Sequence, residues 1–250
     1  MAERHYPRAP ITEALIDLQV AFTSPPEYSD FVRYGESLVA TYPSASPINF
    51  LQVKFEDRDG KKDEPAVDSG MTKVGVRLTS TSADRILQLQ RRGFTFSHMP
   101  PYSRWASFAA EARVQWEQFV ATFHPIAVTR AAVRYINRIV IPSASADMQQ
   151  YFRMYPQVPG GVPQTVTGCF MQLVMPQSDI SDSASAVINF ALEPQSEPDT
   201  LSFLLDFDVF SACELTPSGD EVWDTLAQLR NRKNELFEAS ITDAARGLFK

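Results

Sequence analysis

The sequence predicts an α+β protein, built from two pseudo-duplicated β-α-β(3–4)-α units that form a curved, mainly antiparallel sheet with two long helices packed on one face. Short segments in which polar and apolar residues alternate, as in half-buried strands, recur along the whole chain. Two stretches, residues 94–123 and 208–241, each read as a strand that enters a long helix through a turn containing Pro and Ser. Residues 6–124 and 125–250 are the expected halves of a single globular unit, 1–250.

Length and charge limit the class of protein. The 250 residues, of which 44% are hydrophobic, suffice for one sizeable core. The formal net charge is −7. This disfavours a nucleic-acid partner, because binding to phosphates depends on a basic surface, although a local basic groove stays open.

Cysteine usage and the absence of long apolar runs indicate the compartment. Cys169 and Cys213 both lie in apolar strand-like segments, which favours reduced, buried thiols over a redox pair. The first residues contain no signal-peptide core, and no apolar run approaches the length of a membrane span. A cytoplasmic protein with no membrane partner is expected.

The first half contains five expected strands, at residues 11–22, 49–56, 74–80, 85–90 and 94–98. Residues 27–42 predict an amphipathic helix, and residues 103–123 predict a long helix with a wide apolar face. The charged segment 57–68 is most simply the solvated end of a hairpin.

The second half repeats this order. Strands are expected at residues 128–141, 166–175, 186–192 and 201–211. A short helix is expected at 147–155, a flexible connection at 156–163, and a final long helix at 218–249.

A few identities between the halves favour a duplication. A shift of about 117 residues places 128–131 on 11–14, with Thr and Ala in common. A shift of about 118 residues places Trp223 and Phe237 of the last helix on Trp105 and Phe119 of the first. The first strands of the two halves should therefore meet in the middle of the sheet, with the face opposite the helices left available for a ligand or partner.

No catalytic signature is complete. The sequence has no glycine-rich phosphate loop, no zinc-protease motif and no nucleophile elbow. His5, His98 and His124 lie far apart, and each is expected in a surface or turn position rather than as a metal ligand. No catalytic residue, metal or cofactor is predicted, and whether the chain is an enzyme stays open, with a binding role favoured.

Two polar sets on strands are candidate binding residues. In RYINRI, Arg134 and Arg138 share one strand face and Asn137 lies on the other. Ion pairs with Glu13 and Asp17 of the first strand, across the pseudo-two-fold, are the favoured interpretation of these arginines, and anion binding is the alternative. Asp206 and Asp208 also share a face, which suits either an open polar surface, the favoured interpretation, or a Mg²⁺ or acid–base site.

The last helix carries a third polar set. The repeat alignment places Arg230 and Asn234 on its inward stripe, where the first long helix has Ala112 and Trp116. A polar pair on an apolar stripe destabilises the fold unless it is partnered. We therefore expect bonds to Asp206 or Asp208, or else a helix less buried than its twin that binds another chain.

Three segments carry a resemblance to a known family. They read Y-x-x-A-P-I-x-E-A at residues 6–14, RYINRIVIP at 134–142 and N-E-L-F-E-A-S-I-T at 234–242. Together they resemble a sporadically distributed family of uncharacterised bacterial proteins of about this length. The patchy occurrence of that family implies a role in phage defence or in a toxin–antitoxin-type operon. The order of elements also resembles the duplicated β-α-β4-α layout of TATA-box-binding-protein-like and helix-grip folds.

The expected function is a non-enzymatic binding or regulatory protein of bacterial origin that acts through a protein partner, one encoded nearby being the natural candidate. The alternative is a nucleic-acid-binding or processing protein. Its polar sheet face would be formed by residues with hydrogen-bonding side chains: Arg77, Gln88, Gln90, Arg91, Arg92, Thr95, Arg134 and Arg138. A third hypothesis is a small-molecule pocket between the sheet and a long helix. The sequence does not define the oligomeric state.

Overall fold

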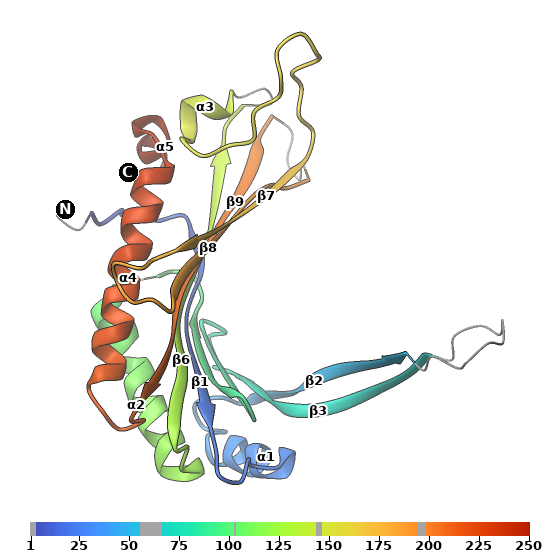
Figure 1. Ribbon diagram of the computed structural model, residues 1–250, viewed down its shortest axis with the longest axis vertical. Coiled ribbons are helices and arrows are strands. Elements are labelled where there is room, and N and C mark those ends of the chain that lie inside the picture. The colour runs from blue at the N-terminus through green and yellow to red at the C-terminus, as the bar shows by residue number, and fades with distance from the viewer. Residues whose placement is uncertain (1–3, 56–66, 103, 144–146, 195–198) are drawn as a thin grey trace.

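One curved antiparallel sheet forms the framework of the protein, and helices cover its convex side (Figure 1). The computed structural model describes residues 4–55, 67–102, 104–143, 147–194 and 199–250, with the backbone alone for 51–55 and 67–70. Within these ranges it has nine strands and five helices, which confirms the α+β class. The expected charged hairpin end at 57–68 lies almost entirely outside the described residues.

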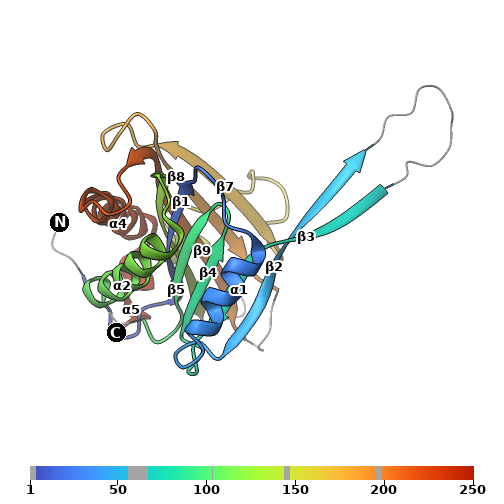
Figure 2. The same cartoon turned by 90° about the horizontal axis from the view of Figure 1, so that it is seen from below.

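The strands follow the sheet order β2-β3-β4-β5-β1-β6-β9-β8-β7, and every neighbouring pair is antiparallel. Their bounds are β1 Ile11–Ala21, β2 Ser44–Phe55, β3 Val67–Thr79, β4 Arg85–Gln90, β5 Gly93–His98, β6 Ala127–Ile141, β7 Cys169–Pro176, β8 Ala184–Leu192 and β9 Leu201–Leu215. Both β2 and β3 continue beyond the sheet as a two-stranded arm (Figures 1 and 2).

The helices are α1 Tyr28–Ser37, α2 Trp105–Phe123, α3 Met148–Tyr151, α4 Glu221–Ser240 and α5 Asp243–Gly247. Figure 2 shows α2 and α4 on the side of the sheet away from the arm, while α1 lies beside β3, where the Lys73 Nζ of β3 is 5.3 Å from the Tyr28 ring centroid of α1. No described helix is both long enough and apolar enough to cross a membrane.

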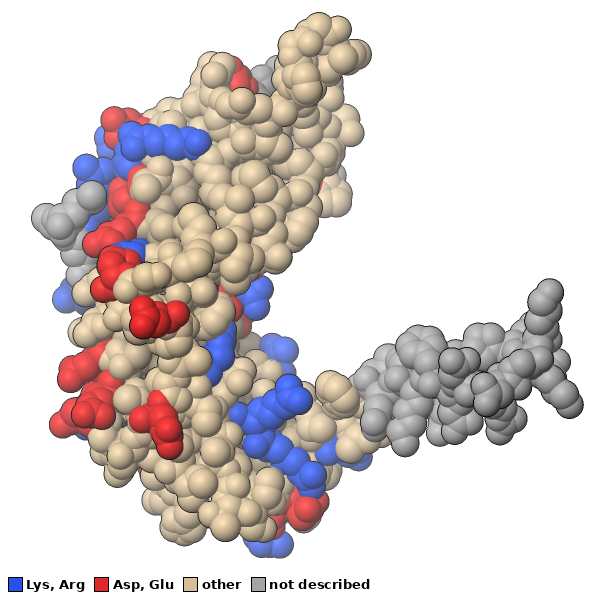
Figure 3. Space-filling view, viewed as in Figure 1, with Lys and Arg blue, Asp and Glu red and all other residues tan. Residues whose placement is uncertain are grey.

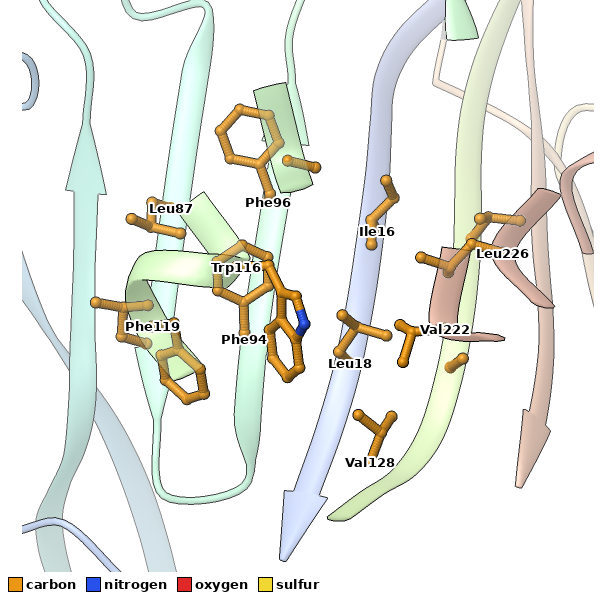
Figure 4. Close-up of a cluster of buried hydrophobic side chains, with 14 of the residues drawn as sticks. Ile16, Leu18, Leu87, Phe94, Phe96, Trp116, Phe119, Val128, Val222 and Leu226 are labelled. Atoms are coloured by element: carbon orange, nitrogen blue, oxygen red, sulfur yellow. The ribbon is translucent and has the colours of Figure 1, made fainter. Parts of the chain in front are cut away.

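Strict alternation on the central strands separates the two faces of the sheet. In β1, Ala14, Ile16 and Leu18 are fully buried beneath the helices, while Glu13 and Asp17 point to the open face. Opposite them, α2 buries Phe108, Ala112, Trp116 and Phe119, the stripe expected from its helical periodicity. Figure 4 shows α2 and α4 meeting the same β1 surface from two sides.

Three helix predictions are wrong in extent. The short helix expected at 147–155 covers only Met148–Tyr151, because the chain is extended at Phe152, which forms a β-bridge with Ile241. The first helix, expected to reach residue 42, ends at Ser37, because Tyr42 is buried and the chain turns back towards the core. The last helix, expected to run to 249, breaks at Ile241, which forms a β-bridge with Phe152. Thr242 then caps α5 by accepting a hydrogen bond from the backbone N–H of Ala245.

Gly93 is required where β5 crosses closest to β1. A Cβ atom at this position would lie 2.1 Å from the Leu18 carbonyl oxygen. The nearest atoms all belong to the backbone of Leu18 and Gln19, so no flexible side chain can move aside. We expect Gly93→Ala to lower the free energy of unfolding by roughly 3 kcal/mol, since one of the two central strands must move. Urea denaturation followed by circular dichroism measures this loss.

Gly247→Ala is the matched control, because nothing lies within 4 Å of the added Cβ atom. It should change the free energy of unfolding by less than about 0.5 kcal/mol. Equal stabilities of the two variants would contradict the close approach of β5 and β1.

Candidate functional site

A cavity of about 940 Å³ lies between the sheet and α4, on the helix-covered face. Its walls come from three distant parts of the chain: the N-terminal segment before β1, the start of α2, and the middle of α4. The floor is formed by β6. The lining residues are Arg4, His5, Tyr6, Ala9, Pro10, Ile11, Tyr102, Arg104, Trp105, Ala106, Tyr135, Asn137, Arg230, Asn231, Lys233, Asn234, Glu235, Phe237 and Glu238.

Two buried polar side chains of β6 form the floor. Asn137 is 3% exposed, and its Nδ2 donates to the carbonyl oxygens of Tyr135 (3.2 Å) and Leu205 (3.0 Å). These bonds fix the amide and leave its oxygen as a hydrogen-bond acceptor. The hydroxyls of Tyr135 and Tyr102 lie 2.9 Å apart, which links the floor to the segment that enters α2.

Most of the inward stripe of α4 is shifted by one residue along the sequence from the predicted stripe. Its buried residues are Val222, Leu226, Leu229, Lys233, Phe237 and Ser240. Arg230 and Asn234 instead flank this stripe and line the cavity. The prediction was wrong because the repeat alignment turned Ala227 and Arg230 inward. Their neighbours Leu226 and Leu229 bury more apolar area and occupy the inward positions instead.

Lys233 is the charged residue that α4 buries. It is 7% exposed, and its Nζ lies 3.7 Å from the centroid of the Tyr135 ring, within cation–π distance. The guanidinium of Arg230 lies 5.9 Å from the Trp105 ring centroid, which connects α4 to the first turn of α2. Neither Arg230 nor Asn234 reaches Asp206 or Asp208, since those carboxylates lie on the opposite face of the sheet; this expectation was wrong.

The N-terminal segment closes one side of the cavity. Tyr6 donates its hydroxyl hydrogen to Glu238 on α4 (2.6 Å) and packs edge-on against Phe249 (5.4 Å between centroids). Burial, followed by the bond to Glu238, raises the pKa of Tyr6. Glu238 also accepts from Arg246 at 2.9 Å, so its charge is already neutralised.

The chemistry of the lining favours an anion with a flat or apolar part. Four cationic residues, Arg4, Arg104, Arg230 and Lys233, line the cavity with only two acids. Five aromatic side chains also line it: Tyr6, Tyr102, Trp105, Tyr135 and Phe237. The cavity is within the volume range of small-molecule sites, which are mostly apolar with a few placed polar groups.

The open face of the sheet holds the other four candidate residues in ion pairs. Arg134 donates two parallel hydrogen bonds to Asp206, at 2.8 and 2.7 Å. The Asp206 side chain is only 4% exposed and also accepts from Asn189 at 3.0 Å. The bond to Asp206 raises the pKa of Arg134.

Asp208 belongs to a second cluster on this face. Arg130 bridges Asp208 (3.0 Å) on β9 and Asp17 (2.8 Å) on β1. Burial raises the pKa of Asp208, although Arg130 and Arg134 oppose this shift. Since each carboxylate already has an arginine partner, Asp206 and Asp208 do not form an open carboxylate pair.

Arg138 pairs with Glu193 through two bonds of 2.8 and 3.0 Å, in a more exposed position. Arg134 and Arg138 are thus both ion-paired, but with Asp206 on β9 and Glu193 beside β8 rather than with Glu13 and Asp17 of β1, and Asp17 is bound by Arg130 instead. Among the described residues, no three His, Cys, Asp or Glu side chains are arranged to hold a metal ion.

His98, His124 and both cysteines lie outside the cavity, whereas His5 is among its lining residues. His98 is buried, against the expectation of a surface or turn position, and burial lowers its pKa. Cys169 and Cys213 are both free thiols and half-buried.

Sequence reasoning missed Lys233, Tyr6, Tyr102 and Trp105 as members of the site. For Lys233 a signal was present, because Val222, Leu226, Leu229 and Phe237 define an apolar stripe that includes position 233. For Tyr6 no local signal exists, since its partner Glu238 lies 232 residues away in the sequence.

The Arg134–Asp206 pair supports a stability prediction. Arg134→Ala leaves a buried carboxylate without its cation, so we expect a loss of about 3 kcal/mol in the free energy of unfolding. This is the low end of the range for unpaired buried ions, because Asn189 still donates to Asp206. Thermal and urea unfolding at neutral pH measure the loss.

Arg138→Ala is the matched control, with the same substitution on the same strand face. Its pair is half-exposed, so we expect a loss below about 1 kcal/mol. Adding Asp206→Asn to Arg134→Ala should recover much of the stability, because a neutral amide is less costly to bury than a carboxylate. An unchanged unfolding temperature in Arg134→Ala would show that the pair is not structural.

No family model, no curated protein and no solved structure matches this chain. The resemblance of its three segments to the bacterial family therefore stays an expectation. The cavity and the open face are the two surfaces from which a function can be argued.

Proposed function

We propose that the chain is a non-enzymatic binding protein whose ligand, a small anion with an aromatic or apolar part, occupies the cavity between β6, α2 and α4. The proposal rests on one observation, namely that three segments far apart in the sequence line the same cavity. Each of the three segments singled out in the sequence contributes to the lining of this one cavity: Tyr6, Ala9, Pro10 and Ile11 from the first, Tyr135 and Asn137 from the second, and Asn234, Glu235, Phe237 and Glu238 from the third.

The charged groups support an anion rather than a cation as the ligand. Lys233 of α4 lies against the Tyr135 ring at the floor of the cavity, and Arg230 and Arg104 line the same cavity. An acidic protein that gathers cations around one cavity creates a local positive potential there, which concentrates anions. Of the two acids in the lining, Glu238 is neutralised by Arg246, so it opposes this potential little.

The flat side chains support an aromatic or apolar group on the ligand. Trp105 and Tyr102 lie at the start of α2, and Tyr135 lies on the floor. Aromatic rings offer large apolar contact area with few rotatable bonds. The oxygen of Asn137 adds one fixed acceptor, which suits a ligand with an N–H or O–H donor near its apolar part.

A thermal-shift screen with matched pairs tests the ligand class. Each anion is compared with its neutral analogue: a nucleoside monophosphate with the nucleoside, and an aromatic carboxylate with its amide. We expect only anions to raise the unfolding temperature, with a stabilisation of about 2.7 kcal/mol at a hundredfold excess over Kd.

Two arginine variants locate the binding site. Arg230→Ala removes a cation from the cavity and should weaken binding of any anion found by roughly tenfold or more. Arg113→Ala on α2 removes the same charge outside the cavity, where Arg113 pairs with Glu117 and Asp220, and should leave affinity unchanged. Equal affinities of both variants, or stabilisation by the neutral analogues, would rule out this site and ligand class.

The protein partner expected from the sequence, and a role in phage defence or in a toxin–antitoxin-type operon, remain proposals. Nothing in the described structure bears on them directly. A pull-down with the product of the adjacent gene would test the partner, with Arg230→Ala and Arg138→Ala deciding whether the cavity or the open face binds it.

Nucleic-acid binding by the open face is the second candidate. The observation that favours it is the distribution of charge in Figure 3, where Lys and Arg gather on the inner side near the arm while Asp and Glu line much of the helix-covered side. Arg77 lies on the open face of β3 and Arg92 in the turn between β4 and β5; both are exposed, and neither has an ion pair within the described residues. Against it, Arg130, Arg134 and Arg138 are already neutralised by carboxylates.

Gel-shift measurements with single- and double-stranded DNA and RNA decide this candidate. If the open face binds, affinity should fall steeply as salt rises, and a double variant Arg77→Ala, Arg92→Ala should reduce the salt slope by up to about two. The absence of any shift at low salt would end the candidate.

The evolutionary part of the sequence prediction also remains a proposal. We propose that the two halves descend from one β-α-β(3–4)-α unit, as in folds like that of TATA-box-binding proteins. The strand order supports this, because β5-β1 and β9-β6 are arranged symmetrically about the β1–β6 pair and each half ends in a helix of similar length.

A further inference from the structure

The two edges of the sheet are built differently. At one edge, β2 contains Pro47, which lacks a backbone donor, and a register shift follows between Ile48 and Asn49. Proline and bulges are the devices by which natural proteins prevent an edge strand from pairing with another chain. This edge is protected.

The opposite edge, β7, has no such protection. It reads Cys-Phe-Met-Gln-Leu-Val-Met-Pro, with no charged residue, no register shift in its pairing with β8, and no proline before Pro176. No backbone hydrogen bond joins β7 to any described segment other than β8. An uncharged strand edge of eight residues whose pairing has no bulge is a template for pairing with a further strand.

Side chains along β7 add apolar surface to this edge. Phe170 is 69% exposed and Val174 62% exposed, and both point to the open face together with Gln172. Met171 and Leu173 occupy the helix-covered face and are half-buried. Covering this edge would be favourable for two reasons: the free backbone groups would form hydrogen bonds, and the large apolar side chains would be removed from water.

We propose that β7 is covered by β7 of a second copy of this chain, so that two sheets join into one continuous antiparallel sheet across a two-fold axis. The strand is self-complementary about Gln172. When Gln172 faces Gln172 of the second copy, Phe170 faces Val174 on one side of the sheet, and Met171 faces Leu173 on the other. Aromatic–β-branched pairs of this kind stabilise antiparallel strands.

Charge favours this edge over other surfaces for self-association. Each copy carries a net charge of −7, so two copies repel one another at most orientations. Since β7 contributes no charge, pairing through it brings no like charges face to face. The cavity is separate from this edge, because β7 contributes nothing to its lining.

Charge-swap variants at Gln172 test the proposal by sedimentation of the full chain at several protein concentrations. The unaltered chain should form a species of twice 28.0 kDa. Gln172→Lys or Gln172→Glu alone places like charges opposite each other and should leave monomers, at least tenfold weaker in association, whereas an equal mixture of the two should restore the dimer. Gln228→Lys, an equally exposed position on α4, should associate like the unaltered chain.

Three results would overturn the proposal. A chain that is monomeric at all concentrations has no second copy at β7, and the edge then serves a different partner. A dimer that Gln172→Lys does not weaken has its interface elsewhere. A Lys/Glu mixture that stays monomeric excludes the register centred on Gln172. Gln172 is exposed and its side chain donates to Asn189, so all variants should keep the circular dichroism spectrum of the unaltered chain, and a lost spectrum marks a variant that does not fold.

Discussion

The pairing of β1 with β6 is the constraint on which the rest of the structure depends. These strands lie at the centre of the sheet, and within the described part of the chain the two halves meet by strand pairing only here. Their register is fixed from both faces: buried Ile16 faces Val133 under the helices, and Arg130 reaches Asp17 on the open side. A slip by one residue would place charged side chains in the core, so β1 and β6 tolerate a single register.

One face of the sheet is apolar and the other is charged, because this pairing fixes which side chains point to each face. Under α2 and α4, aromatic and aliphatic side chains exclude water, and the cavity forms where the two helices and the N-terminal segment do not fill the space above β6. On the open face, arginines and carboxylates of adjacent strands satisfy one another. Such neutralisation stabilises the strands but removes most of the charge that a polyanion would need.

The existence of each strand and the face of every candidate strand residue could be predicted, because alternation with period two is a local property, although β2 and β3 begin five and seven residues earlier than expected. The central place of β1 and β6 was predicted from the alignment of the two halves. The buried stripe of α4 could not be taken from repeat alignment, since a shift of one residue turns a helix by about 100° and brings Lys233 inward in place of Asn234. The cavity was beyond local reasoning altogether. Its walls join residues such as Tyr6 and Glu238 that only the complete fold brings together.

The N-terminal segment has a consequence for the order of assembly. Its contacts are with segments far along the chain: Tyr6 with Glu238, the Arg8 N–H with the Phe249 carbonyl, and the Pro10 carbonyl with the Arg138 N–H of β6. During synthesis α4 and α5 emerge after all nine described strands, so Tyr6 and Arg8 must wait for their partners. The cavity cannot form on a nascent chain that still lacks α4.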